Sequence, residues 1–205
     1  MMSAETTAKH GGAVSVREYL NDRELLLTAG VHPDDAGYCI LEAIAHAAAR
    51  PKTDDPVALN RPDYRPLNDG LWGSDEARTE HMLRLEEAVG PWWEAADEAD
   101  RLAWAERVVI ATVNRIIAEL PGLPDAVRTQ CRDARTIAEA AEAAARADWA
   151  AEEGPDARAT SPSAMASIDW AATWAAAMAA TWAAAEHVLI LAVDIWIEAI
   201  PAGEE

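Results

Sequence analysis

Apolar residues recur at helical spacing along most of this chain, and they predict a succession of helices. In the second predicted helix, Ile40, Leu41, Ile44 and Ala47 fall three or four positions apart and form one apolar face. A later stretch is apolar over a wide arc from Val108 to Leu120. The predicted helices span residues 15–29, 33–48, 75–89, 92–120, 124–152 and 163–200, with 92–120 and 163–200 central.

Local signals set the ends of these helices. Ser15 followed by Glu18 is a capping box, and Gly30 is a C-terminal stop. Gly90-Pro91 is predicted to separate two helices. Residues 51–73, with four prolines and two glycines, are predicted to be a long irregular connection. Further non-helical segments are expected in the linker 154–161 and in the tails 1–14 and 201–205.

Composition agrees with the helical pattern. Alanine, the best helix former and a poor strand former, accounts for 48 of the 205 residues. Hydrophobic residues make up 51% of the chain, which is enough for a folded core. The fold class predicted is all-α: one helical-bundle-like domain of five to six helices over 15–200, with a long Ala/Trp-rich C-terminal helix. Sub-halves at 15–120 and 124–200 are an alternative division.

The charge balance narrows the class of partner. The chain carries 36 acidic and 17 basic residues, a net charge of -19. Such a surface repels phosphate backbones and anionic lipid, so direct nucleic-acid binding and membrane binding are not expected. It favours solubility and protein partners with a basic patch, or imitation of a polyanion. The oligomeric state is left open.

Two cysteines, Cys39 and Cys131, are too few for a disulfide scaffold, and no CxxC pair indicates zinc. Residues 1–14 lack the apolar segment of a signal peptide. We therefore expect a cytoplasmic protein with reduced thiols.

A tryptophan ladder marks the last predicted helix. Trp170, Trp174, Met178 and Trp182 stand four residues apart and share one stripe. The preferred interpretation is a buried packing helix in which Trp supplies core volume. A partly exposed partner-binding stripe is an alternative. A membrane span is disfavoured because Glu186 and His187 interrupt the apolar stretch and no basic cluster flanks it.

Residues capable of chemistry are few. Glu42 and His46 stand four apart, and His187, Asp194 and Glu198 share another helix face. A bundle could gather such groups around a metal, yet HExxH and Glu-x-x-His are absent. Cys39 is interpreted as a small core residue near the polar edge of its helix. The sequence predicts no catalytic residue, metal or cofactor. A metalloprotein or enzyme using His46 or His187 is an alternative.

Acidic residues concentrate between Asp75 and Glu106, where ten acids accompany three arginines. A solvated helix face is the ordinary interpretation. The sharper alternative is a nucleic-acid mimic, whose spaced carboxylates block a DNA- or RNA-binding protein. The candidate interaction residues are Trp92, Trp93, Glu94, Asp97, Glu98 and Asp100.

One segment resembles a known group of proteins. The run Tyr38-Cys39-Ile40-Leu41-Glu42-Ala43-Ile44, then Leu67-Asn68-Asp69 and a helix ending Leu85-Glu86-Glu87-Ala88-Val89, is similar to small uncharacterised actinobacterial and phage proteins. In that group an aromatic-Cys helix precedes an Asn-Asp turn. The alanine-rich second half resembles helical proteins designated immunity proteins in actinobacterial phages. The resemblance covers about a quarter of the chain and implies an accessory, non-enzymatic role, with no defined activity.

The predicted function is therefore a non-catalytic, acidic protein-binding protein, such as a phage-related inhibitor or an immunity-like protein. Two alternatives stay open. One is the acidic nucleic-acid mimic, and the other is the helical-bundle metalloprotein or enzyme.

Overall fold

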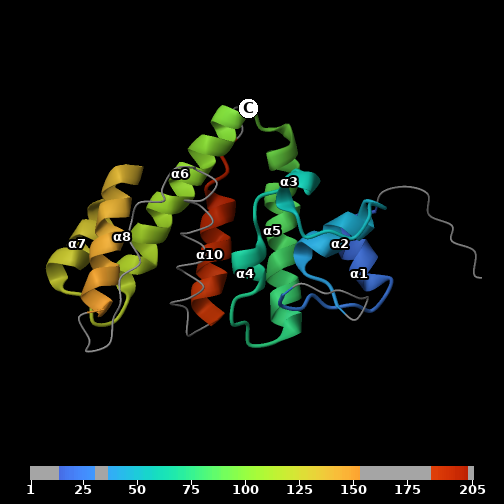
Figure 1. The fold of residues 1–205 in the computed structure, drawn as a ribbon, viewed down its shortest axis with the longest axis horizontal. Coiled ribbons are helices and arrows are strands. Elements are labelled where there is room, and N and C mark those ends of the chain that lie inside the picture. The colour runs from blue at the N-terminus through green and yellow to red at the C-terminus, as the bar shows by residue number, and fades with distance from the viewer. Residues whose placement is uncertain (1–13, 31–36, 153–185, 203–205) are drawn as a thin grey trace, which may run out of the picture.

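The computed structural model describes residues 14–30, 37–152 and 186–202, and it confirms the all-α class (Figure 1). Over these ranges the only extended pairing is an isolated parallel bridge between Leu27 and Tyr38. The helices of the described residues are α1 (Val16–Asn21), α2 (Ile40–Ala47), α3 (Pro56–Leu59), α4 (Arg65–Asn68), α5 (Asp75–Ala95), α6 (Glu98–Arg115), the 3-10 helix η1 (Ile117–Glu119), α7 (Asp125–Asp133), α8 (Ile137–Glu152) and α10 (Glu186–Glu198).

The longer helices stand side by side, with α10 between α5 and α6 (Figure 1). Side chains of α6 hold α10 in this place: Trp104 Nε1 donates to the Trp196 carbonyl at 3.0 Å, and Arg107 Nε donates to the Ala199 carbonyl at 2.7 Å. The last carbonyls of a helix lack partners within the helix, so these donors satisfy them. Among the described residues, α6 and α10 are central, and they correspond to parts of the helices predicted over 92–120 and 163–200. Residues 163–185 of the second prediction lie outside the described residues. Trp170, Trp174, Met178 and Trp182 lie outside the described residues.

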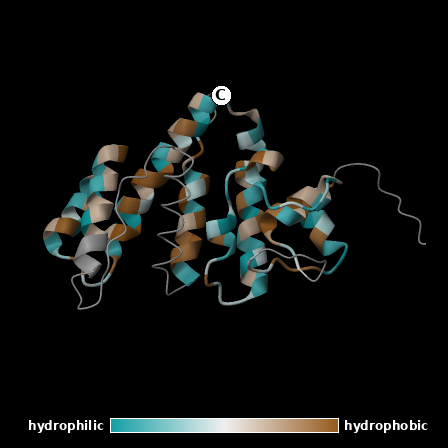
Figure 2. Cartoon of the chain, viewed as in Figure 1, coloured by the Kyte–Doolittle hydropathy of each residue, from teal (hydrophilic) through white to brown (hydrophobic). Residues whose placement is uncertain are grey.

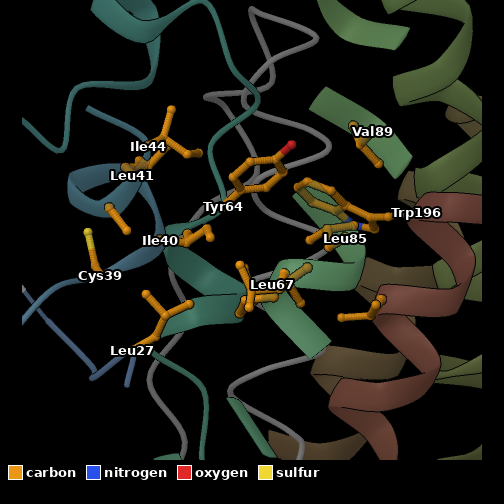
Figure 3. Packing of buried hydrophobic residues seen from close by; sticks show 14 of the residues in the cluster. Leu27, Cys39, Ile40, Leu41, Ile44, Tyr64, Leu67, Leu85, Val89 and Trp196 are labelled. Carbon is orange, nitrogen blue, oxygen red and sulfur yellow. The ribbon is translucent and has the colours of Figure 1, made fainter. Parts of the chain in front are cut away.

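Two hydrophobic clusters form the core of the described residues. Figure 2 shows where hydrophobic and hydrophilic residues fall along the helices. The first cluster contains residues of all five helices from α1 through α5, together with residues of α6 and α10. Figure 3 shows Tyr64 and Trp196 packed among its aliphatic side chains. The second joins the end of α6 to η1, α7 and α8. Since α6 contributes Val108 to the first cluster and Val109 to the second, it links them.

The predicted break at Gly90-Pro91 is wrong, because α5 continues through both residues to Ala95. Gly90 serves packing instead. A Cβ at this position would meet Glu86 Oε1 at 2.5 Å, so glycine makes room for that carboxylate. The interruption comes later, where Asp97 begins α6 by accepting a hydrogen bond from the Asp100 backbone N–H at 2.9 Å.

Other helix boundaries also differ from the sequence prediction. The Ser15–Glu18 capping box is present, but α1 ends at Asn21, and Leu27 instead donates its N–H to Thr79 Oγ1 at 2.8 Å. The second helix begins only after Cys39, its N-cap.

The helix predicted over 124–152 is two helices. Thr136 Oγ1 accepts from the Glu139 backbone N–H at 3.2 Å, and the Glu139 carboxylate accepts from the Thr136 N–H at 3.1 Å. This reciprocal cap starts a new helix. The connection 51–73 contains the short helices α3 and α4.

No helix within 14–30, 37–152 and 186–202 has both the length and the apolar character needed to cross a lipid bilayer.

Candidate functional site

A cavity of about 260 Å³ opens where α3 and the chain after it meet the end of α5, the start of α6 and the end of α10. We call it the aromatic cavity. Its principal walls are Val57, Arg61, Trp93, Arg101, Trp104 and Trp196. Prolines 56 and 62 complete the side formed by α3 and the segment that follows it. The cavity therefore combines residues far apart in the sequence.

Tryptophan rings form one wall of the aromatic cavity. Trp104 lies edge-on to both Trp93 and Trp196, with centroid distances of 5.6 Å and 5.1 Å. Trp104 and Trp196 are fully buried, whereas Trp93 is half-buried. The indole Nε1 of Trp196 is buried with no hydrogen-bond acceptor among the described residues. An unsatisfied buried donor costs free energy.

Arg61, which lines the cavity, forms a buried ion pair with Glu86. Arg61 Nε donates to Glu86 Oε1 at 2.8 Å, and Arg61 Nη1 donates to Glu94 Oε1 at 2.7 Å. Glu86 is only 7% exposed, and this burial raises the pKa of its carboxyl, while Arg61 opposes the increase. Burial, together with the Glu86 charge, holds the pKa of the neighbouring Tyr64 hydroxyl well above its ordinary value.

The other charged groups of the cavity also have partners. The Arg101 guanidinium lies 4.9 Å from the centroid of the Trp93 ring, and its Nη2 donates to the Trp93 carbonyl at 2.6 Å. The Asp63 carboxylate accepts two hydrogen bonds from the Arg65 guanidinium, each 2.7 Å long. The charged groups that line the aromatic cavity are therefore hydrogen-bonded within the protein, and Arg61 and Asp63 also have ionic partners.

The cavity has an exposed apolar lining residue, and exposed acids lie next in sequence to its lining residues Trp93 and Arg101. Val57, which lines the cavity, is 85% exposed. The group of exposed acids, here called the acidic rim, follows the end of α5 and the start of α6. Its members are all exposed: Glu94, Asp97, Glu98 and Asp100.

The six predicted interaction residues thus occur together at the α5–α6 junction, but their exposure differs. Trp92 and Trp93 are half-buried rather than exposed, because they pack on Trp104. Trp93 lines the aromatic cavity. Sequence reasoning missed Val57 and Arg61, since 51–73 read as an irregular connection, and it missed Trp196 because this residue comes from the distant helix α10. In 51–73, the prolines and the apolar Val57 between polar neighbours were the only available signal.

Arginines neutralise much of the acidic run. Arg17 pairs with Glu80 and Glu87 at 3.0 Å and 2.5 Å, and Arg61 pairs with Glu86 and Glu94. Arg78 pairs with Asp75. Five of the ten acids between Asp75 and Glu106 are therefore engaged by an arginine, which lowers the anionic field that a mimic needs.

Most residues considered for a metal have structural partners, and His187 is exposed. Glu42 Oε2 accepts from the Cys39 backbone N–H at 2.9 Å, and Asp194 and Glu198 pair with arginines 84 and 115. His46 stacks against the Tyr19 ring at 5.9 Å. In the part of the chain that the structure describes, no three His, Cys, Asp or Glu side chains converge as metal ligands would.

Cys39 lies in the core, not at a polar helix edge. It is 2% exposed, and burial raises the pKa of its thiol to about 12. A thiol with this pKa is almost fully protonated at about pH 8 and is a poor nucleophile.

We expect native protein to react with iodoacetamide at least about a hundredfold more slowly than urea-unfolded protein. Labelling at both cysteines, followed by mass spectrometry, measures this, and comparable rates would contradict it.

Comparison with known proteins finds no match among family models, curated proteins or solved structures.

Proposed function

We propose that this protein is a non-catalytic protein-binding protein, with the aromatic cavity and its rim as the interaction site. The observation that carries the proposal is the 85%-exposed Val57 beside a tryptophan-lined hollow. Binding hot spots in protein interfaces are enriched in Trp, Tyr and Arg that pack around a pocket. An accessory role agrees with the resemblance of residues 37–89 to small actinobacterial and phage proteins, and an immunity-like inhibitor agrees with the resemblance of the alanine-rich second half. A cytoplasmic location agrees with the same role.

Charge indicates the type of partner. The acidic rim adds Asp97, Glu98 and Asp100, none of which has an arginine partner within the described residues, to a chain of net charge -19. A partner surface carrying Lys or Arg would therefore associate faster than a neutral one. We propose a protein partner with a basic patch around an apolar group that enters the aromatic cavity.

A pair of variants tests the site. Val57 and Leu71 are both aliphatic and strongly exposed, at 85% and 72%, but Leu71 lies beyond the other end of α5. Val57→Arg should block the cavity mouth, whereas Leu71→Arg makes the same chemical change elsewhere. Exposed substitutions of this kind alter stability by only about 0.5 kcal/mol, so both variants should fold.

Immobilised wild-type protein should retain a partner from an actinobacterial lysate. Val57→Arg should reduce that retention by at least about tenfold, while Leu71→Arg should leave it unchanged. Equal retention by all three proteins, quantified by mass spectrometry, would refute the proposed site.

The salt dependence of the captured complex separates this proposal from the nucleic-acid mimic. A mimic depends on many charge contacts and should lose most of its affinity as screening shortens to about 10 Å near 0.1 M salt. Binding through the aromatic cavity should keep its affinity as the salt concentration rises, and only the association rate should fall. Steep loss of affinity together with normal binding by Val57→Arg would favour the mimic.

A further inference from the structure

Two arginines line the aromatic cavity, and they differ in their partners. Arg61 pairs with two carboxylates, whereas Arg101 forms no ion pair with any residue that the structure describes. Arg101 is held by neutral groups instead. Its Nε and Nη2 donate to the Trp93 carbonyl at 3.0 Å and 2.6 Å, and its guanidinium lies over the Trp93 ring. The cavity therefore contains a guanidinium that is fixed in position and has no counter-charge.

Each of these guanidinium groups also keeps one nitrogen for an external acceptor. Arg61 donates through Nε and Nη1, and Arg101 donates through Nε and Nη2. Nη2 of Arg61 and Nη1 of Arg101 are thus left without an acceptor among the described residues, and neither belongs to the buried polar atoms that lack a partner there. Both nitrogens are therefore open to solvent, and a ligand oxygen can accept from them without displacing an internal hydrogen bond.

The rest of the lining suits an apolar body of small size. Val57 is strongly exposed, and Pro56 and the half-buried Trp93 lie beside it in the lining. The carboxylate of Asp63, the remaining charged residue of the lining, is engaged by Arg65. The volume of about 260 Å³ is slightly below that of cavities for drug-sized ligands, so a smaller molecule fits.

The charge outside the cavity limits the ligand to a single negative charge. The acidic rim and the net charge of -19 repel polyanions, because the repulsion grows with each added charge. A single carboxylate meets less repulsion, and it forms charge-assisted hydrogen bonds with a guanidinium that are about twice as strong as neutral ones.

We propose that the aromatic cavity binds a small monocarboxylate with an apolar body, whose carboxylate accepts hydrogen bonds from Arg101. The apolar body lies against Val57 and Pro56. This ligand goes beyond the proposed function and does not depend on it, because it binds the isolated protein. It occupies the space that a partner's apolar group would enter, so the two occupants compete.

Calorimetric titration of the full chain tests the proposal. The probes are phenylacetate and hexanoate, which carry an aromatic and an aliphatic body, and the controls are their neutral amides. We expect saturable binding of at least one acid, with a Kd below about 1 mM. Its amide has nearly the same shape but no charge to pair with a guanidinium, so it should bind at least about tenfold more weakly.

A matched pair of variants locates the carboxylate. Arg101 and Arg107 both lie on α6, and both donate to a backbone carbonyl without an ionic partner among the described residues. Arg107 is not part of the cavity lining. Arg101→Gln should weaken binding of the acid at least about tenfold, whereas Arg107→Gln should leave it unchanged.

Circular dichroism checks that both variants are folded. If Arg101→Gln is not, NMR of the wild-type protein replaces it. Nuclear Overhauser effects should then connect the ligand protons to the Val57 methyl groups, and their absence at saturation would contradict the site.

The other outcomes are also decisive. The proposal is overturned if neither acid shows saturable binding, if acid and amide bind equally, or if Arg101→Gln binds as wild type does. A short peptide ending in a free phenylalanine carboxylate that binds at least about tenfold more tightly than both acids would identify a chain end as the occupant and overturn the assignment to a small molecule. Partner capture that depends on Val57 without acid binding removes only the ligand site, and acid binding without partner capture removes only the proposed function.

Discussion

Replacing Trp104 with alanine is expected to lower the free energy of unfolding by about 3–5 kcal/mol. Trp104 is 1% exposed and contacts the rings of Trp92, Trp93 and Trp196, so truncation leaves a cavity at the centre of the first cluster. It also removes the donor to the Trp196 carbonyl. Urea unfolding followed by far-UV circular dichroism measures the change without depending on tryptophan fluorescence.

Two matched variants separate the contributions of Trp104. Trp104→Phe keeps a six-membered ring but removes the N–H donor and the rest of the indole, so we expect a loss smaller than that of Trp104→Ala, of which about 1–2 kcal/mol comes from the hydrogen bond. Trp93→Ala truncates a half-buried neighbour and should cost less than Trp104→Ala. A loss below about 1 kcal/mol for Trp104→Ala would mean that α6 and α10 do not depend on this contact.

Replacing Arg61 with methionine should destabilise the fold by about 3–5 kcal/mol near neutral pH. The substitution keeps an apolar stem but leaves the Glu86 carboxylate buried without its counter-charge. Because Arg61 is the main group that lowers the pKa of Glu86, its loss should raise this pKa further. The Glu94 carboxylate is 58% exposed and should simply return to water.

The sign of the pH dependence follows from the raised pKa. When the folded pKa of Glu86 exceeds the unfolded value, the native state retains the proton, and stability falls as pH rises through the folded pKa. The difference between wild type and Arg61→Met should therefore be small at about pH 5 and larger at about pH 7. Adding Glu86→Gln to Arg61→Met removes the titrating group and should remove this dependence. A difference that is constant with pH would contradict the assignment to Glu86.

Much of the fold could be predicted from local signals. The alanine content indicated the all-α class, the cap at Ser15 occurs as predicted, and the apolar arc after Val108 identified the linking helix α6. Local rules failed where tertiary packing overrode them. Gly90 reads as a helix end, yet it lies inside α5 because the Glu86 carboxylate occupies the space of a side chain there.

The candidate site was predictable only in part, for the same reason. Trp92, Trp93 and the acidic rim are neighbours in sequence, and their composition indicated an interface. Trp196 joins them from a position 92 residues beyond Trp104, and Arg61 approaches from a segment 33 residues before Glu94. Such long-range contacts leave no periodic pattern in the chain.

The placement of α10 between α5 and α6 has a consequence for biosynthesis. Arg84 on α5 pairs with Asp194, which is 110 residues further along the chain, so the first cluster closes through contacts of very long sequence separation. Such contacts form late because the intervening loop must first be closed. During translation the apolar faces of α5 and α6 therefore stay uncovered until α10 has left the ribosome. In that interval the nascent chain exposes the surface that a chaperone would bind.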